Sequence, residues 1–247
     1  MLSKNELLQT MQKIDVTKIV QPGIDVFGVL LMEPVTTVTN LFIAAMSFYA
    51  FYMINKNKYT NNTVMFLKIY FLLMGFATAW GGIIGHGFLY ALGEPWKLGG
   101  WITSMFAVAC IERSAISYAN RFIPVRLGKF FLLANIIELM ALLSLVVYTL
   151  HFRYVEYHSA YGLIIVVFSF HSFVFFKTRD LGSFNMIIAT ISLIAAVYAF
   201  NKPLIIDEFF NHRDLAHLFM LLGAYFQYRS FLYMGKTGGK RSASISI

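Results

Sequence analysis

The chain has 247 residues, of which 58% are hydrophobic, 17% aromatic and only 13% charged. A soluble domain carries roughly 25% charged residues, so this composition excludes an ordinary soluble protein. The net charge of +8 does not indicate a nucleic-acid partner, because the basic residues lie in short segments between apolar runs, as in membrane proteins. The single cysteine, Cys110, excludes an intrachain disulfide and a cysteine-based zinc site.

Residues 1–30 are predicted to form an N-terminal interfacial segment. Charged residues interrupt the first 20 positions, so no signal peptide is expected there. Leu7, Met11 and Ile14 recur on one helical face, which favours an amphipathic helix lying at the membrane surface. Pro22 would end this helix. The alternative is a disordered tail.

Seven apolar runs follow, and each is long enough to cross about 30 Å of hydrocarbon. They cover residues 34–55, 64–91, 98–119, 129–150, 155–176, 182–200 and 214–234. Turn residues or charges separate them, for example Gly93-Glu94-Pro95. The sequence therefore predicts an all-α, polytopic membrane domain, a seven-transmembrane-helix bundle over 31–235. A disordered cytoplasmic tail is expected over 236–247.

The basic residues predict the orientation of this bundle. One set of connections, together with the tail, carries ten of them: Lys56, Lys58, Arg121, Arg126, Lys129, Lys177, Arg179, Lys236, Lys240 and Arg241. The opposite connections carry four: Lys97, Arg153, Lys202 and Arg213. By the positive-inside rule, the C-terminus is cytoplasmic and the N-terminus lies outside.

Ionisable residues within a membrane are costly and mark functional sites. With this orientation, Glu33, His86 and His158 lie at the outer ends of their spans. Asp207 and Glu208 lie in an outer loop, and His212, Asp214 and His217 open the last span. Segments remote in sequence are thus expected to bring His, Asp and Glu side chains to one depth.

These residues suggest a metal site. Asp214 and His217 are spaced i and i+3, so both point from one helical face. With His86 as a third ligand, and His212 as an alternative or additional one, they would form an open zinc site, which lowers the pKa of bound water to about 7. The competing interpretation is that Asp214 only caps the helix N-terminus.

Glycines surround His86, at positions 81, 82, 85 and 87. They leave room beside the imidazole for water or a substrate. The alternative is that they serve helix packing only, to which the spacing of Gly81 and Gly85 is well suited.

A second polar group lies deeper, toward the cytoplasm. Glu112 and Arg113 lie about two turns from the inner end of their span, and Glu138 about two and a half turns. A structural ion pair between Arg113 and Glu138 is predicted in preference to a proton path, although Arg113 could pair with Glu112 instead. His171 is expected to be a hydrogen-bonded core residue.

At these residues the chain resembles the superfamily that joins alkaline ceramidases, progestin and adiponectin receptors, and Per1-like membrane proteins. Glu33-Pro-Val-Thr-Thr-Val-Thr-Asn40 resembles its first motif, Gly82-Ile-Ile-Gly-His86 its second, and Arg213-Asp-Leu-Ala-His217 its third. The resemblance spans the whole bundle and implies seven helices and zinc held by three histidines. Its characterised enzymes hydrolyse the amide bond of ceramide.

The chain departs from this pattern at three positions. Gly82 replaces the usual Ser, Arg213 replaces the first His of the last motif, and Lys97 stands where an Asp is expected. The usual oxyanion and acid–base helpers are therefore missing. The resemblance indicates a divergent, bacterial-type branch.

Three functions remain open from the sequence. The first is a zinc-dependent hydrolase of a lipid amide or ester at the outer face, with Glu33 or Glu94 as acid or base. Glu33 and Asn40 would orient a ligand or hold a second, harder cation such as calcium. The second is a non-catalytic lipid-binding or assembly protein. The third is a haem-binding redox subunit with His86 and His217 as axial ligands. Membrane lipid is the expected partner in the first two.

Overall fold

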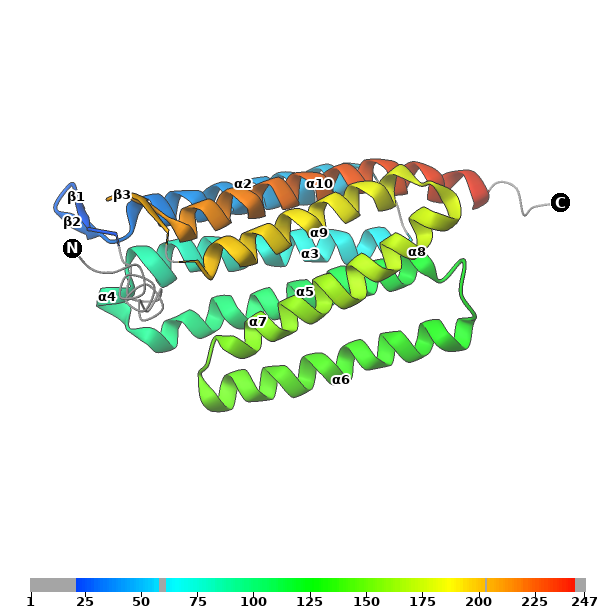
Figure 1. The fold of residues 1–247 in the computed structure, drawn as a ribbon, viewed down its shortest axis with the longest axis horizontal. Coiled ribbons are helices and arrows are strands. Elements are labelled where there is room, and N and C mark those ends of the chain that lie inside the picture. Colours follow the sequence, from blue (N-terminus) through cyan, green and yellow to red (C-terminus); the bar gives the residue numbers. More distant parts are fainter. Residues whose placement is uncertain (1–20, 58–60, 203, 243–247) are drawn as a thin grey trace, which may run out of the picture.

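A computed structural model describes residues 21–57, 61–202 and 204–242. The expected amphipathic helix in the first 20 residues and the last five residues of the expected tail lie outside the described residues. The described chain is almost entirely helical, as the composition predicted (Figure 1).

Within the described residues, long helical segments run up and down the bundle. They are α2 (Pro34–Lys56), α3 with the π-helix η2 (Asn62–Trp80 and Gly81–Gly87), α5 (Lys97–Ala119), α6 (Val125–Thr149), α7 with the π-helix η4 and α8 (Arg153–Ala160, Tyr161–Val167 and Phe168–Thr178), α9 (Leu181–Phe200) and α10 (His212–Ser242). Their bounds follow the predicted apolar runs within a few residues, except that α10 continues beyond 236, where the tail was expected to begin.

Short elements gather at the end of the bundle opposite the C-terminus (Figure 1). They are the helix α4 (Leu89–Leu92), the 3-10 turn η3 (Glu94–Trp96), and two hairpins, β1–β2 (Ile24–Val26 and Val29–Leu31) and β3–β4 (Ile205–Asp207 and Phe210–Asn211). Phe27 and Gly28 turn the first hairpin with positive φ at both positions, the conformation of a two-residue hairpin loop. The sequence did not predict these strands. They lead the chain into α2 and α10 at the same end.

Five helical segments are long and apolar enough to cross a membrane: Pro34–Lys56, Asn62–Gly87, Val125–Thr149, Arg153–Thr178 and Leu181–Phe200. Two further helices, α5 and α10, were also expected to be spans. Charged residues lower their mean hydropathy: Glu112 and Arg113 lie inside α5, and Arg213, Asp214 and Arg229 lie in α10. Apolar segments of this length and number make the chain an integral membrane protein.

The surface of the bundle is apolar where a soluble protein would be polar. On α6, Phe130 is 61% exposed, Leu133 56% and Ile137 61%, and they recur at helical spacing. A soluble monomer rarely exposes a large continuous apolar face. This apolar face of α6 is suited to contact with the hydrocarbon of a membrane.

The centre of the bundle is closely packed around α5. Phe71 of α3, Ile111 of α5, Val174 of α8 and Phe231 of α10 are fully buried in one apolar cluster. Alanines such as Ala107 line the helix contacts, so the backbones approach closely.

Helix α9 begins with an N-terminal cap that also ties it to α5. The carboxylate of Asp180 accepts hydrogen bonds from the backbone N–H of Ser183 (2.8 Å) and the hydroxyl of Tyr118 (2.7 Å). Burial raises the pKa of Asp180, but the hydrogen bonds from Tyr118 and Ser183 together outweigh it, so the pKa lies below its ordinary value.

Replacing Asp180 by Ala should lower the free energy of unfolding in detergent micelles by about 1–2 kcal/mol, because an N-cap is lost. A depressed pKa in the folded state stabilises the fold above the unfolded pKa of about 3.9. This contribution is lost as the pH falls through the folded value. Thermal melting between pH 3 and 7 measures both effects. Asp207→Ala, at the exposed end of strand β3, is the control. Identical melting of Asp180→Ala and wild type at pH 7 would contradict the assignment.

Candidate functional site

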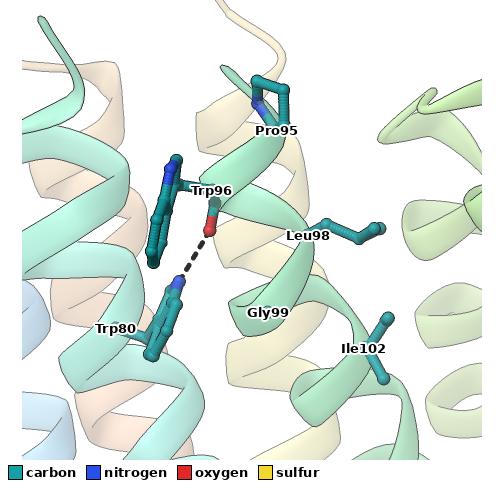
Figure 2. Close-up of a pocket in the computed structure, with 6 residues that line it drawn as sticks. All are labelled: Trp80, Pro95, Trp96, Leu98, Gly99 and Ile102. Atoms are coloured by element: carbon teal, nitrogen blue, oxygen red, sulfur yellow. Dashed lines mark hydrogen bonds between the residues drawn. The ribbon is translucent and has the colours of Figure 1, made fainter. Parts of the chain in front are cut away.

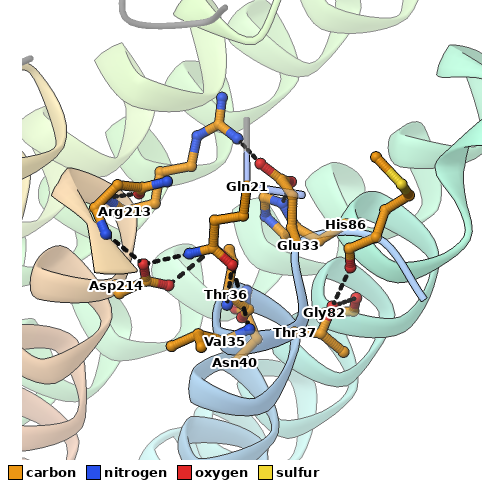
Figure 3. A network of polar contacts seen from close by, with 12 residues as sticks. Gln21, Glu33, Val35, Thr36, Thr37, Asn40, Gly82, His86, Arg213 and Asp214 are labelled. Atoms are coloured by element: carbon orange, nitrogen blue, oxygen red, sulfur yellow. Dashed lines mark hydrogen bonds and ion pairs between the residues drawn. The ribbon is translucent and has the colours of Figure 1, made fainter. Parts of the chain in front are cut away.

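Three segments meet at the end of the bundle that carries the hairpins: the residue before α2, the π-helix η2 and the first turn of α10 (Figure 3). Glu33 lies between the other two segments. One carboxylate oxygen, Oε2, is 2.5 Å from Nδ1 of His86, and the other, Oε1, accepts a hydrogen bond from Nη1 of Arg213. Glu33 and His86, expected at one depth, are therefore in direct contact.

The backbone of Glu33 is held in a sparsely populated conformation. It adopts left-handed dihedral angles, φ 43° and ψ 57°, at the N-cap of α2. Pro34 fixes the first helical φ, and the Glu33 carbonyl accepts the first helical bond from Thr37 N at 2.8 Å. A non-glycine residue in this region costs on the order of 1–3 kcal/mol and persists only where its surroundings impose it. The two side-chain bonds of Glu33 supply that constraint.

Positive charge surrounds the Glu33 carboxylate. Burial raises the pKa of Glu33. The hydrogen bond and charge of His86, followed by the charges of Arg213 and Lys97, lower this pKa by more than burial raises it. The pKa of Glu33 therefore lies below its ordinary value, and the group is a carboxylate at neutral pH. A carboxylate at Nδ1 places a proton on that nitrogen and leaves the lone pair of Nε2 for chemistry.

Asp214 is buried and fully hydrogen-bonded. Its Oδ2 accepts from Gln21 Nε2 (2.5 Å) and from the backbone N–H of Asn211 (2.8 Å), and its Oδ1 accepts from the Thr36 hydroxyl (2.8 Å) (Figure 3). Gln21 also accepts from the N–H groups of Val35 and Thr36 with its Oε1. Asp214 thus joins the starts of α2 and α10, the helix-capping interpretation that the sequence had left open.

His217 lies one turn further into α10 and faces His86. Its Nδ1 is 2.8 Å from the Thr39 hydroxyl, and the centres of the His86 and His217 rings are 6.2 Å apart. Among the described residues, Nε2 of neither imidazole takes part in a hydrogen bond. His86 is the more accessible of the two, with 23% of its side chain exposed.

Three other predicted site residues play different parts. His212 packs its ring against Phe200 of α9, and in the described part of the chain its buried Nδ1 has no hydrogen-bond partner. Asn40 donates to the Thr36 carbonyl of its own helix. Glu94 is exposed and pairs with Lys97, and no described contact joins it to Glu33. Glu94 is therefore outside the contact network of the site.

The zinc implied by the family resemblance does not fit the donors present. A catalytic zinc takes three protein ligands and a water molecule. His86 and His217 can each offer Nε2, but Arg213 stands at the third position, and both oxygens of Asp214 are already hydrogen-bonded. Across the described residues, the one group of three or more His, Cys, Asp or Glu ligand atoms lying mutually close is elsewhere in the bundle.

The expected ion pair between Arg113 and Glu138 is not formed, and the prediction was wrong. Glu138 instead accepts from Nδ1 of His158, with both oxygens at 2.9 Å. Arg113 donates to the Leu132 carbonyl and to Oδ1 of Asn135, both at 3.3 Å. The direction in which each residue faces depends on helix rotation, which depth along a helix does not give. The depth expected for His158 was also wrong: it was placed with His86 and His217, but it contacts Glu138 in the interior group.

The glycines near His86 divide into two kinds. A Cβ on Gly82 would lie 2.9 Å from Cβ of Asn40 and 3.0 Å from the Thr37 carbonyl, so this glycine lets η2 approach α2. By contrast, a Cβ on Gly81 or Gly85 would meet no described atom within 4 Å. The alternative that Gly81 and Gly85 pack against a neighbouring helix is therefore wrong, and the close approaches beside His86 belong to Gly82 and Gly87.

An apolar groove of about 410 Å³ opens beside the start of η2 (Figure 2). Trp80, Trp96 and Leu98 line it, and Nε1 of Trp80 donates to the Trp96 carbonyl at 2.7 Å. Tryptophan is enriched where a membrane meets water. The groove, between the end of α3 and the start of α5, lies toward the same end of the bundle as the polar site.

Sequence reasoning missed Gln21 and Thr36 and gave Arg213 no role. The spacing of Thr36 and Thr39 from Glu33 was a usable signal, because these residues share a helix face at i, i+3. Gln21 offered no signal, because the β1–β2 hairpin, which the sequence did not predict, brings it back to the start of α2.

Replacing Gly82 by Ala should destabilise the protein and displace His86, because the added methyl group overlaps Asn40 and the Thr37 carbonyl. Overpacking of this kind costs about 1–3 kcal/mol. Thermal melting in micelles measures the loss, and Gly85→Ala is the matched control on the same π-helix. Equal melting temperatures for the two variants would show that η2 does not press against α2.

One family model matches this chain, that of a family of unknown function (DUF6962), over residues 35–236. The match covers all of the long helices, and the chain belongs to this family. No curated protein and no solved structure matches it.

Proposed function

We propose that this member of DUF6962 is a seven-span membrane hydrolase that cleaves an ester or amide bond of a lipid at the outer end of its bundle, with His86 as general base. The observation that carries the proposal is the contact between Glu33 and His86. It reproduces the orienting step of acid–base catalysis, in which a carboxylate holds one imidazole nitrogen and frees the other to accept a proton.

Packing supports α5 and α10 as two further spans, in addition to the five apolar segments. Glu112 is fully buried, and Arg113 is hydrogen-bonded to α6. At the start of α10, Asp214 is fully buried and hydrogen-bonded. Charges within spans face the bundle interior rather than lipid, so the lower hydropathy of these two helices is compatible with crossing.

The proposed reaction uses a water molecule as the nucleophile. Nε2 of His86 takes its proton as the oxygen attacks the substrate carbonyl. The resulting imidazolium is stabilised by the Glu33 carboxylate on its other nitrogen, and later returns the proton to the leaving alcohol or amine. Arg213 adds a fixed positive charge beside this base, which favours the negative charge that develops on the carbonyl oxygen.

A lipid is the substrate class that the surroundings favour. An apolar groove lined by Trp80 and Trp96 lies toward the same end of the bundle as the polar site, and it offers an acyl chain a place to bind. The resemblance to ceramidases points to the same class.

A non-catalytic lipid-binding protein is the second candidate. The observation that favours it is the saturation of the network: Glu33 and Asp214 use their oxygens on internal partners, as in a structural lock. In that case the lipid would bind without turnover.

Purified protein in mixed micelles should release fatty acid from ceramide or from a phospholipid ester. His86→Gln and Glu33→Gln should each lower kcat by about 100-fold or more, the range of a general base. Glu94→Gln, an exposed carboxylate paired with Lys97, is the matched control and should keep full activity. Fatty-acid release is followed by mass spectrometry.

Two results would overturn the hydrolase. One is the absence of fatty-acid release from every substrate while fluorescent ceramide or phospholipid still binds, which supports the second candidate. The other is full activity of His86→Gln, which removes the proposed base. Metal analysis of the same samples tests zinc separately, because His86→Gln with His217→Gln should not change the metal content.

The orientation is tested by labelling. In a Cys110→Ala background, a cysteine placed at Glu94 should react with an impermeant maleimide from outside intact cells. The connections at the other end of the bundle, together with the tail, carry ten of the lysines and arginines, against four at the end of Glu94. A cysteine at Lys56 is the control and should react only after lysis. The reverse pattern would move the site to the cytoplasmic face.

A further inference from the structure

A second polar cluster lies inside the bundle, away from the site described above. Glu112 of α5, Glu138 of α6 and His158 of α7 each place one ligand atom within 4.8 Å of the other two. Glu112 and His158 are fully buried, and Glu138 is 16% exposed. Apolar residues of the same three helices, including Met105, Leu139 and Val155, pack around them. Ionisable groups in such surroundings need a counter-charge.

The ring of His158 is oriented as in a metal ligand. Its Nε2 is 2.9 Å from the carbonyl of Met105, which accepts hydrogen bonds only, so Nε2 carries the proton. The other nitrogen, Nδ1, faces Glu138 and donates to it the proton that a bound metal ion would displace. Histidines that bind metals characteristically donate their other N–H to a carbonyl or carboxylate.

Glu112 is the strongest indication of a missing ligand. Neither of its carboxylate oxygens makes a hydrogen bond with any described residue, although the side chain is 0% exposed. Nearby Asn135 gives one amide N–H to the Ala109 carbonyl and accepts from Arg113 with its oxygen; its second N–H lies near Glu112 but outside hydrogen-bond geometry. A neutral carboxylic acid would be expected to donate its proton to an acceptor, and an ionised one needs a cation.

The backbone leaves space for this carboxylate. A Cβ on Gly162 would lie 2.5 Å from Oε1 of Glu112, so only glycine admits the side chain at this position. Gly162 belongs to η4, the π-helix that directly follows the helix of His158. Single π-turns of this kind occur frequently at functional sites.

We propose that Glu112, Glu138 and His158 bind one divalent transition-metal ion. Two carboxylates and a neutral imidazole balance the charge of such an ion, and a cation between the three groups takes the place of the proton shared by His158 and Glu138. One nitrogen and several oxygen ligands suit zinc or manganese better than calcium or magnesium, which prefer oxygen alone.

The ion would add a shared ligand to three helices that are already joined by hydrogen bonds of Arg113, Asn135 and His158. Helix α6 lies at the edge of the bundle, beside α5 and α7 (Figure 1). Its outer face is apolar and exposed, so it depends on its inner face for attachment. A metal held by α5, α6 and α7 stabilises that attachment.

The test uses full-length protein in micelles, without an activity assay. After chelation, addition of Zn²⁺ or Mn²⁺ alone should raise the melting temperature and give about one bound ion per chain by mass spectrometry. Glu112→Gln and His158→Gln should each weaken binding by more than about tenfold. Glu156→Gln, a carboxylate of the same α7 that pairs with Arg153, is the matched control and should bind normally.

The wild-type measurement keeps the proposal testable even where a variant does not fold. A melting temperature unchanged by chelator, Zn²⁺ and Mn²⁺, with no bound metal, would overturn the proposal and leave a proton-sharing cluster. Retention of full metal by folded Glu112→Gln and His158→Gln would also overturn it. Loss of metal in His86→Gln with His217→Gln would place the ion at the outer site instead. None of these outcomes depends on the hydrolase proposal.

Discussion

The arrangement of the end of the bundle that carries the hairpins depends on the carboxylate of Glu33, which is bonded to His86 on one side and to Arg213 on the other. These bonds join the start of α2 to η2 and to α10, three segments far apart in the sequence. They also impose the left-handed backbone of Glu33. The strain and the bonds are therefore parts of one feature: the backbone turns so that the carboxylate reaches both partners, and α2 begins only after that turn.

The two polar clusters differ in how many hydrogen-bond donors their buried carboxylates have. At the hairpin end of the bundle both buried carboxylates have donors: Asp214 has Gln21, Thr36 and Asn211, and Glu33 has His86 and Arg213. In the interior, Glu138 is paired but Glu112 is not. The first cluster is complete without a ligand, which is consistent with a site that turns over or binds a transient molecule. The second cluster is incomplete, which is why a resident cation is inferred there and not at the hairpin end.

The amino-acid sequence was sufficient for the approximate bounds of the helices. Bilayer thickness sets span length, and charges or turn residues mark the ends, so segments such as 34–55 were placed closely. Which residues touch was less accessible. The pairing of Glu138 with His158 rather than Arg113 depends on the rotation of α6 about its axis, and apolar periodicity is weak where lipid and protein are both apolar. The same limitation concealed the choice of Gly82 over Gly81 and Gly85 for contact with α2.

Arg213 connects these observations. In a site built from three histidines, a metal ion supplies the positive charge. Here a guanidinium stands at the third position, and it is held by Glu33 beside His86. A permanent cation at this position would repel a metal ion from Nε2 of His86, because two positive charges a few ångströms apart in a poorly hydrated site are strongly unfavourable. By the resemblance to ceramidases, Arg213 would take the place of the metal as the source of charge, and the Glu33–His86 contact is the part of the site that we propose moves a proton.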